Sequence, residues 1–488
     1  MEKIQEFRIN LEEDSLKNVY KIKGNIDEFS EQTKIIELCN DLSTLLKLPN
    51  ETVKTKLKQI LYGKFDYFDV QPKFKIKLNL IESIKYIIYF VILIIFQNKT
   101  KNKNKKVDLI LDNVEKEYVI KKFEKILSSF NKPLILLKSS FVKKESYNKN
   151  YIFLNEHMDL LSNNILRGKR FQTLVFLKKL IFFSYKNNIN FLKIFFTIFY
   201  TSLKYYKIFN VYESKVLIHD RVYHTCPIRN YLFKKYGGKK ILCLQSHLAE
   251  GTTSVFCDID TLVTFGKEKD TEKKLISLGG KINKSIQCGS LRMEQELKFK
   301  DKINKIDPID ILIIGINPAI WRGTSKTIIE IYYEQIKWIA AISNEFPEFN
   351  LIYKHHANFK GDSFEKKILE NANINTIVQT KNMTNSYHYL LKSKLILSFA
   401  STMILEGLSL GKKCFFLDPQ KKNSTFFGGL NYLNELRISS YEDLKKKINE
   451  NLIINKTNNK IDNDIFCLPH ESVSNKICKL ILDTNNNL

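Results

Sequence analysis

Two hydroxyl residues stand late in the chain, where an apolar run meets a helical pattern. Ser401 and Thr402 follow KLILSFA and precede MILEGLSLG, which reads as a strand and then an amphipathic helix ending at Gly411. Hydroxyls at this position cap a helix, and the free N–H groups of its first turn favour a phosphate. Glu406 lies about one helical turn further on, where a carboxylate could accept both hydroxyls of a ribose. The same residues would equally suit a capped helix without a ligand.

Two further apolar runs end in residues that suit phosphate groups. The run LIYKHHANF leads into Lys354, His355 and His356. A cation and an imidazole at a strand end can neutralise a diphosphate leaving group, although paired histidines are also common in structural roles. The run IDILIIGINPAIWRGT carries Gly315, which lets a backbone approach a ligand, and Arg322, which can hold a phosphate through two hydrogen bonds.

A third polar group follows the apolar run KKILCL in the first half of the chain. It contains Gln245, His247 and Glu250, in the order QSHLAEG. An imidazole or a carboxylate near an acceptor hydroxyl can remove its proton. His247 and Glu250 are therefore the two candidates for a catalytic base.

Short apolar runs alternate with amphipathic stretches from Val107 onward. This order predicts parallel βαβ units, whose strands are buried on both faces and read as continuously apolar. The lysine-rich stretch KFKDKINKIDP separates one such unit from a second that starts at IDILIIG. We therefore predict an α/β protein with two Rossmann-like, doubly wound domains at 105–300 and 301–488, after a mainly helical region at 1–104. Ligands bind such sheets at the carboxyl ends of the strands, so the cleft between the domains is the expected site.

The motifs occur in an order that resembles a known enzyme family. From Lys392 to Pro419 the chain has a strand, Ser-Thr, a helix with an internal glutamate, Gly-Lys, an apolar strand and Asp-Pro. This succession resembles the carboxyl-terminal domain of GT-B glycosyltransferases, and it is closest to those that build bacterial capsule, lipopolysaccharide and teichoic-type polymers. The resemblance covers roughly Val216 to Asp418. It implies that domain 301–488 binds a nucleotide-sugar donor and that domain 105–300 binds the acceptor. By the same resemblance, the donor-binding residues are Gly315, Arg322, Lys354, His355, Ser401, Thr402 and Glu406.

The sequence departs from the family pattern at two places. Ala357 stands where the K-x-H-P segment of these enzymes has proline, and Ser246 interrupts a Q-H-G segment. Asp258 and Asp260 form the D-x-D pattern with which GT-A enzymes hold a metal ion, but here the pattern precedes an apolar strand and does not follow one. We interpret it as a turn at the strand start. Neither a metal ion nor another cofactor is expected, because helix dipoles and basic side chains can stabilise a leaving diphosphate.

The formal charge of +26, from 78 Lys and Arg against 52 Asp and Glu, favours anionic partners. An A+T-biased genome would also give this lysine-rich composition. Nucleic acid is not the expected partner, because the chain has no aromatic RNA-binding motif, zinc-finger spacing or arginine-rich recognition helix. Phosphate-bearing substrates and acidic lipids remain as the anionic partners.

The segment 76–96 is rich in apolar residues, and the basic tract KTKNKNKK follows it. Its continuous apolar part, from Tyr86 to Phe96, is too short for a helix that spans a bilayer, which needs about 20 residues. It is interpreted either as a monotopic contact with an anionic membrane surface or as a buried helix. The eight cysteines include no CxxC pair and the amino terminus has no apolar signal core. We expect a cytoplasmic protein that can reach the inner face of the membrane.

The leading function from the sequence is transfer of a sugar from a nucleotide-sugar donor to a surface-polysaccharide or lipid-linked acceptor. Three alternatives remain. They are a transferase of polyol phosphate from CDP-glycerol or CDP-ribitol, a sugar-nucleotide 2-epimerase, and a non-catalytic partner in capsule assembly. An epimerase would need further carboxylates at the site and no membrane-facing surface.

Overall fold

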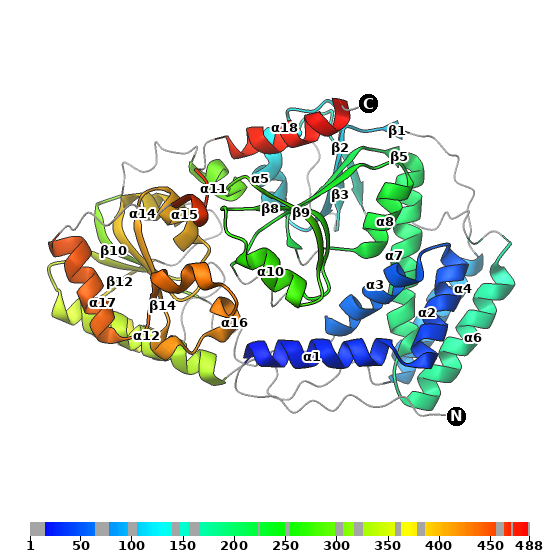
Figure 1. Cartoon of the computed structure of the whole chain (residues 1–488), viewed down its shortest axis with the longest axis horizontal. Coiled ribbons are helices and arrows are strands. Elements are labelled where there is room, and N and C mark those ends of the chain that lie inside the picture. Colours follow the sequence, from blue (N-terminus) through cyan, green and yellow to red (C-terminus); the bar gives the residue numbers. More distant parts are fainter. Residues whose placement is uncertain are drawn as a thin grey trace.

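The computed structural model describes most of the chain. The described residues are 15–63, 78–95, 105–138, 147–155, 166, 168–222, 225–248, 254–297, 306–316, 326–356, 363–377, 386–454, 463–469 and 472–486. They form two α/β domains and a layer of helices that packs on the first domain (Figure 1).

The first domain is built on a parallel sheet of seven strands. Their order across the sheet is β4-β3-β2-β6-β7-β8-β9, and every pairing is parallel. The chain therefore builds one half of the sheet outward from β2 and then crosses back to build the other half from β6, as in a Rossmann fold. The strands are β2 (Leu109–Val114), β3 (Pro133–Leu137), β4 (Ile152–Asn155), β6 (Val216–His219), β7 (Lys240–Leu244), β8 (Asp258–Thr264) and β9 (Lys281–Gln287). A small separate pair joins β1 (Lys105–Lys106) to β5 (Tyr212–Glu213).

Both faces of this sheet are covered, because alternate side chains of its central strands enter different cores. In β2, Ile110 packs into the core shared with the helical layer, whereas Leu109 and Leu111 pack into the core on the opposite face. The opposite face is covered by α5 (Glu117–Leu127) and by the last helix of the chain, α18 (Val473–Asn486). This two-sided burial explains why central strands such as β6 (VLIH) and β7 (KILCL) are largely apolar.

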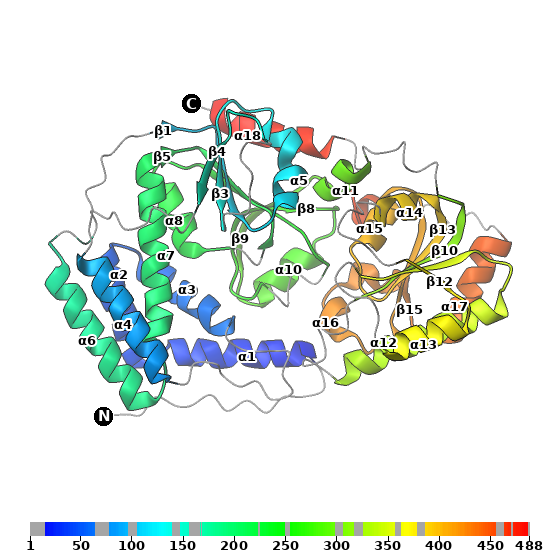
Figure 2. The ribbon, with the colours of Figure 1, turned by 180° about the vertical axis from the view of Figure 1, so that it is seen from behind.

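The helical layer combines helices from two parts of the chain. α7 packs against the other helices of the layer and against α8. Pro49 is the N-cap of α3 and separates this helix from α2. The helices are α1 (Ser15–Ser30), α2 (Thr33–Leu46), α3 (Asn50–Tyr62), α4 (Leu80–Ile95), α6 (Arg170–Asn187), α7 (Phe191–Val211) and α8 (Pro227–Lys235). In Figures 1 and 2, α2, α4, α6 and α7 lie at the end of the molecule farthest from the second domain, whereas α1 runs from that end to α16 (Ser424–Phe427) of the second domain.

The second domain has a parallel sheet of six strands with the strand order of a Rossmann fold. The order is β12-β11-β10-β13-β14-β15, so β10 and β13 mark the reversal. The strands are β10 (Ile309–Ile314), β11 (Leu351–Lys354), β12 (Asn375–Ile377), β13 (Ser393–Ser398), β14 (Lys413–Leu417) and β15 (Arg437–Ile438). Its helices are α12 (Lys326–Glu345), α13 (Ser363–Asn371), α14 (Ser386–Lys392), α15 (Met403–Ser409), α16 (Ser424–Phe427) and α17 (Tyr441–Ile448). Figure 2 shows α12 and α13 along one side of this sheet and α14 and α15 on the other. The predicted α/β class with two Rossmann-like domains is confirmed.

The chain passes between the domains twice. It leaves the first domain through α11 (Leu291–Glu296), which follows β9, and it returns through residues 463–469 to α18. On the way back, Leu468 N–H donates to the carbonyl of Phe265 at 2.8 Å, and Lys267 N–H donates to that of Asp464 at 2.9 Å. Helix α10 (Asp270–Ser277) of the first domain lies beside the second, where Lys274 Nζ donates to the Thr425 carbonyl at 3.3 Å. These bonds hold the domains together.

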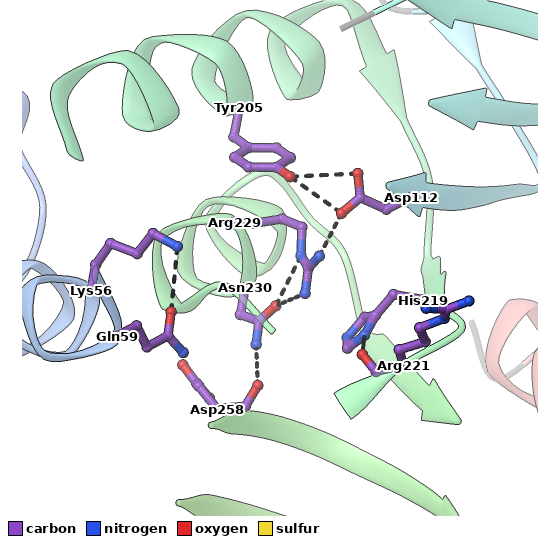
Figure 3. A network of polar contacts seen from close by, with 9 residues as sticks. All are labelled: Lys56, Gln59, Asp112, Tyr205, His219, Arg221, Arg229, Asn230 and Asp258. Carbon is purple, nitrogen blue, oxygen red and sulfur yellow. Dashed lines mark hydrogen bonds and ion pairs between the residues drawn. The ribbon is translucent and has the colours of Figure 1, made fainter. Parts of the chain in front are cut away.

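A buried polar network lies inside the first domain (Figure 3). The guanidinium of Arg229 on α8 donates to the Asp112 carboxylate of β2 at 2.5 Å, and both side chains are almost completely buried. Tyr205 of α7 donates to the same carboxylate at 3.2 Å. Asn230 accepts from Arg229 at 3.2 Å and donates to the carbonyl of Asp258 at 2.8 Å. The network therefore joins a central strand to two helices and to the start of β8.

Two sequence predictions about the chain as a whole can be compared with these elements. All cysteines except Cys478 are buried, in agreement with the positions of several of them inside apolar runs. No helix in the described part of the chain is long and apolar enough to cross a bilayer. The segment 76–96 contains α4, which buries Phe90 against the helical layer while its opposite side stays exposed.

Candidate functional site

The carboxyl-end elements of the two sheets meet at α11. Helix α11 follows the carboxyl end of β9, and α15 follows that of β13. Ser290, the N-cap of α11, donates its hydroxyl to Glu406 of α15 at 2.5 Å. Parallel sheets of this type bind ligands at the carboxyl ends of their strands, where the strand order reverses. The candidate site is therefore the region around α11, bordered by the ends of β6, β7, β10, β11 and β13.

Gly315 directly follows β10 and lies against β11. Its N–H donates to the carbonyl of Lys354 at 2.9 Å. A Cβ at this position would lie 2.6 Å from the Tyr353 hydroxyl and 3.1 Å from the Lys354 carbonyl oxygen. Gly315 thus permits a close approach between the ends of β10 and β11. The group that its backbone approaches is Lys354 of the protein, whereas the sequence predicts an approach to a ligand.

Lys354 is the last residue of β11, and its side chain is nearly buried. Its amine donates to the carbonyl of His355 at 3.4 Å. Burial, with a further contribution from the positive charge of Arg292, lowers the pKa of Lys354 to about 8. The amine is therefore a cation whose charge is sensitive to pH just above neutrality.

The two histidines after Lys354 have different surroundings. The buried imidazole of His355 lies 2.9 Å from the Glu365 carboxylate and 5.0 Å, ring to ring, from Tyr353. Glu365 also accepts a hydrogen bond from Tyr332. These contacts place His355 within its own domain. His356 is half-buried, and burial together with the charges of Lys354 and Arg292 lowers its pKa.

Ser401 and Thr402 stand between β13 and α15, as the sequence predicts. Both are half-buried. The Ser401 hydroxyl accepts from the N–H of Met403 at 3.3 Å, while Thr402 occupies the N-cap position without a side-chain cap bond. The helix that they precede has only seven residues. The two hydroxyls therefore lie at the strand reversal of the second sheet.

Glu406 is buried, and both of its carboxylate oxygens accept hydrogen bonds from the protein. One accepts from Ser290, and the other accepts from the Tyr387 hydroxyl at 2.9 Å. Burial raises the pKa of Glu406, while Ser290, Arg292 and Tyr387 oppose that rise. In this structure the carboxylate therefore links α15 to α14 and to the start of α11.

Arg292 is the residue that connects the two sides of the site. It is exposed, and its guanidinium carbon lies 6.0 Å from the ring centre of Tyr387. Its charge lowers the pKa of Lys354 and His356 in the second domain and that of His247 in the first. Three titratable groups from two domains thus share one guanidinium as a neighbour.

His247 follows β7 in the first domain. The residue is exposed to solvent on one side, but its imidazole has protein atoms densely packed around it. That desolvation, followed by the charges of Arg221, Lys122 and Arg292, lowers the pKa of His247 to about 4. The imidazole is therefore neutral at pH 7 and can accept a proton.

The cations beside His247 belong to a cluster at the end of β6. Asp220, which is buried, lies 3.6 Å from the Lys122 amine and 3.4 Å from the Arg221 guanidinium. The Arg221 guanidinium also lies 5.8 Å from the ring centre of Tyr118. One carboxylate faces two cations here, so the cluster has an excess of positive charge.

Of the predicted site residues, Glu406 bonds to the N-cap of α11, and the charge of Arg292 on that helix lowers the pKa of His247 and Lys354. His355 instead contacts Glu365 of its own domain. Glu250 and Arg322 lie outside the described residues, so their predicted roles stay predictions. The D-x-D residues Asp258 and Asp260 are the first and third residues of β8, so they lie in the amino-terminal part of the strand itself and not in a turn before it.

Three basic residues of the site are absent from the sequence prediction: Lys122, Arg221 and Arg292. Arg221 could have been found, because KVLIHDR places it at the end of an apolar run. Arg292 lies shortly after β9, which reads KINKSIQ. Because β9 is polar, the sequence does not predict a strand here, and Arg292 is not recognised as a residue near a strand end. Lys122 lies within α5 and carries no local signal.

No protein-family model matches the sequence, and no curated protein matches it significantly. Several solved structures have a similar fold. The UDP-GlcNAc 2-epimerase of Neisseria meningitidis bound to UDP-GlcNAc is 13% identical, with a TM-score of 0.46 over 78% of this chain and 100% of that chain. The wall teichoic acid polymerase TagF is 12% identical, with a TM-score of 0.45 over 84% and 99%. The UDP-N-acetylglucosamine 2-epimerase of Rickettsia bellii is 16% identical, with a TM-score of 0.44 over 78% and 96%. At these identities and TM-scores the likeness carries no argument about function, and the fold described above rests on its own strand order.

Proposed function

We propose that this protein is a glycosyltransferase that moves a sugar from a nucleotide-sugar donor to a surface-polysaccharide or lipid-linked acceptor. The observation that carries the proposal is the position of α11, whose N-cap Ser290 donates to Glu406 of the second domain at 2.5 Å. Arg292 of the same helix lies 6.0 Å from the ring centre of Tyr387, and its charge also lowers the pKa of His247 in the first domain and of Lys354 in the second. If the donor binds to the second sheet and the acceptor to the first, the leaving diphosphate lies between those groups. Fixed cations at that point stabilise the charge that develops as the glycosidic bond breaks.

On the donor side, Lys354 and Arg292 would hold the diphosphate, and the hydroxyls of Ser401 and Thr402 would donate to it. Glu406 would accept the ribose hydroxyls. Because its two oxygens already accept from Ser290 and Tyr387, the ribose would replace the Ser290 hydroxyl. His355 would position the loop that follows β11 through its contact with Glu365. The cations would take the part of a metal ion in neutralising the leaving group.

On the acceptor side, His247 would remove the proton of the attacking hydroxyl. Its low pKa makes it a weak base while the charges of Arg221, Lys122 and Arg292 act on it. A phosphate on the acceptor, seated beside Lys122 and Arg221, would offset their charge and raise the pKa of His247 toward the range of an effective base. This supports an acceptor that carries phosphate, such as a lipid-linked glycan. Glu250 remains the other candidate for the base.

A panel of labelled donors tests the proposed reaction. The full-length protein is incubated with UDP-, GDP-, dTDP-, CDP- and CMP-linked sugars and with lipid-phosphate acceptors, and both products are followed. Release of the nucleotide with transfer of the labelled sugar to lipid would support the proposal. Transfer of a polyol phosphate from CDP-glycerol or CDP-ribitol, or conversion of a nucleotide sugar without acceptor, would replace it by one of the alternative reactions. Absence of nucleotide binding in calorimetry would favour a non-catalytic partner.

A variant pair tests the site. Arg292→Gln removes the shared guanidinium and should lower kcat by about a hundredfold or more, because it removes charge that stabilises the leaving group. Lys273→Gln, on an exposed position of α10, is the control and should leave kcat unchanged. Equal activity of the two variants would contradict the site assignment.

A further inference from the structure

Helices α4 and α6 expose an unusual number of large apolar side chains. Of the nineteen that are exposed in the described part of the chain, twelve lie on these two helices. The most prominent are Ile81, which is 83% exposed, Phe171 at 78%, Tyr185 at 75% and Phe182 at 52%, together with Ile84 and Ile88. The two helices pack against each other and against α7. We call their outer side the α4/α6 face.

Each of the two helices buries one apolar side in the core and exposes a second apolar side on the α4/α6 face. In α6, Phe176, Leu180 and Phe183 are buried against the helical layer, while Phe171 and Phe182 point away from it. A helix that is apolar on opposite sides is normally covered on both. A contiguous exposed apolar face on a folded protein indicates an interaction surface.

The charges around the face select the kind of partner. Helix α6 carries Arg170, Lys178, Lys179 and Lys186 and has no acidic residue. The carboxylates that border the face are already paired: Asp41 of α2 contacts Lys179 at 2.6 Å, and Glu82 of α4 contacts Lys193. Lys179 is matched by Asp41, and α6 carries three further cations, Arg170, Lys178 and Lys186, and no carboxylate. An apolar face with this excess of positive charge matches the boundary between acyl chains and anionic headgroups in a bilayer.

A second copy of this chain is a poorer partner for the same face. It would bring the same basic helix against α6, and each copy carries a formal charge of +26. Crossing the bilayer is not an option for either helix, since no helix among the described residues meets the length and apolarity for it. An orientation in the plane of the bilayer surface satisfies the apolar side chains and the lysines together.

We propose that the α4/α6 face binds the surface of an anionic phospholipid bilayer, with Phe171, Phe182 and Ile81 inserted at the headgroup boundary. The sequence indicates a membrane contact only for the segment 76–96, which contains α4. The α4/α6 face adds α6, a helix about 75 residues further along the chain. It is independent of the proposed reaction, because none of its residues belongs to the site around α11.

The test is co-sedimentation of the full-length protein with vesicles. Vesicles of phosphatidylcholine with phosphatidylglycerol should retain the protein, and vesicles of phosphatidylcholine alone should retain less. The variant Ile81→Ser/Phe171→Ser/Phe182→Ser should lower partitioning by about tenfold or more. Lys178→Glu should lower binding to the anionic vesicles by roughly fivefold or more, the equivalent of about 1 kcal/mol for each basic group at the surface.

The matched control replaces three apolar residues that are exposed elsewhere, as Ile276→Ser/Ile454→Ser/Leu482→Ser, and should partition like the unchanged protein. Circular dichroism and thermal melting identify any variant that fails to fold. For a misfolded triple variant, the single change Phe171→Ser takes its place. Equal partitioning of the face variant and the control would overturn the proposal. So would a dimer in solution that the face variant, and not the control, converts to monomer.

Discussion

Among single residues, Lys354 has a charge that depends on its surroundings. Burial and the nearby Arg292 lower its pKa to about 8, so the amine loses its proton within reach of physiological pH. Above that pH a bound diphosphate must first restore the proton. We therefore expect the Kd for a nucleoside diphosphate to rise by up to about tenfold per pH unit above the pKa. Calorimetric titration at a series of pH values measures this slope.

The conservative variant Lys354→Arg tests whether titration of the Lys354 amine causes the pH dependence of Kd. A guanidinium keeps its charge throughout this range, so the variant should show no such rise in Kd. A pH slope that is the same in both proteins would show that another group titrates, and Lys354 would then lose its proposed role.

Glu406 predicts a pH dependence of stability. Its folded pKa is raised by burial above the ordinary value, so the folded protein holds a proton that the unfolded chain releases. Stability from this group is complete below the unfolded pKa of about 4.5 and is lost as the pH rises through the folded pKa. The variant Glu406→Gln cannot ionise at this position, so its stability does not fall with pH for this reason. The difference in unfolding free energy, variant minus unchanged protein, should therefore grow with rising pH.

Urea denaturation at several pH values measures that difference. A difference that stays constant across the range would mean that Glu406 ionises normally in the folded protein.

Local patterns locate Glu406 and Lys354 in the sequence, because a strand, a turn and a helix leave a readable order of apolar and polar residues. Arg292 is different. Its importance comes from the meeting of two domains, and the effect of its charge on Lys354 has no signature in the residues around either of them. His355 shows the same limit, because its partner Glu365 lies on a helix that only the folded domain brings near.

At the scale of elements, the pair formed by Arg229 and Asp112 holds α8 to β2. Removing one partner leaves a buried charge without compensation. We expect Asp112→Ala to lower the free energy of unfolding by about 3–5 kcal/mol. Glu37→Ala breaks an exposed ion pair with Lys34 and should cost less than about 1 kcal/mol. Chemical denaturation of both variants measures the contrast, and similar costs would contradict a structural role for the buried pair.

The sequence predicts those elements that are buried on both faces. β2, β6, β10 and β13 each contain a run of three or more apolar residues because each strand is covered on two sides. β9 was missed, since it is an edge strand with largely exposed or half-buried side chains and reads as KINKSIQ. Edge strands need polar residues to remain soluble, and this removes the apolar signal.

At the scale of the whole molecule, Gly266 lies where the returning chain touches the first domain. A Cβ at this position would lie 2.2 Å from the carbonyl oxygen of Ile465, which belongs to the backbone and cannot rotate away. Gly266→Ala should therefore destabilise the protein by about 1–3 kcal/mol. Gly24→Ala, in α1 with open space around it, should stabilise by about 0.5–1 kcal/mol. Denaturant unfolding checks both, and a neutral Gly266→Ala would show that the contact yields without cost.

The position of α18 has a consequence for synthesis of the chain. Val473, Ile477 and Ile481 complete the core on one face of the first sheet, together with residues such as Leu109 and Val119. Those partners leave the ribosome more than 350 residues earlier. The domain built on β2 therefore cannot close this core until α18 has been translated, and this sheet face lacks its α18 cover while the second domain is synthesised.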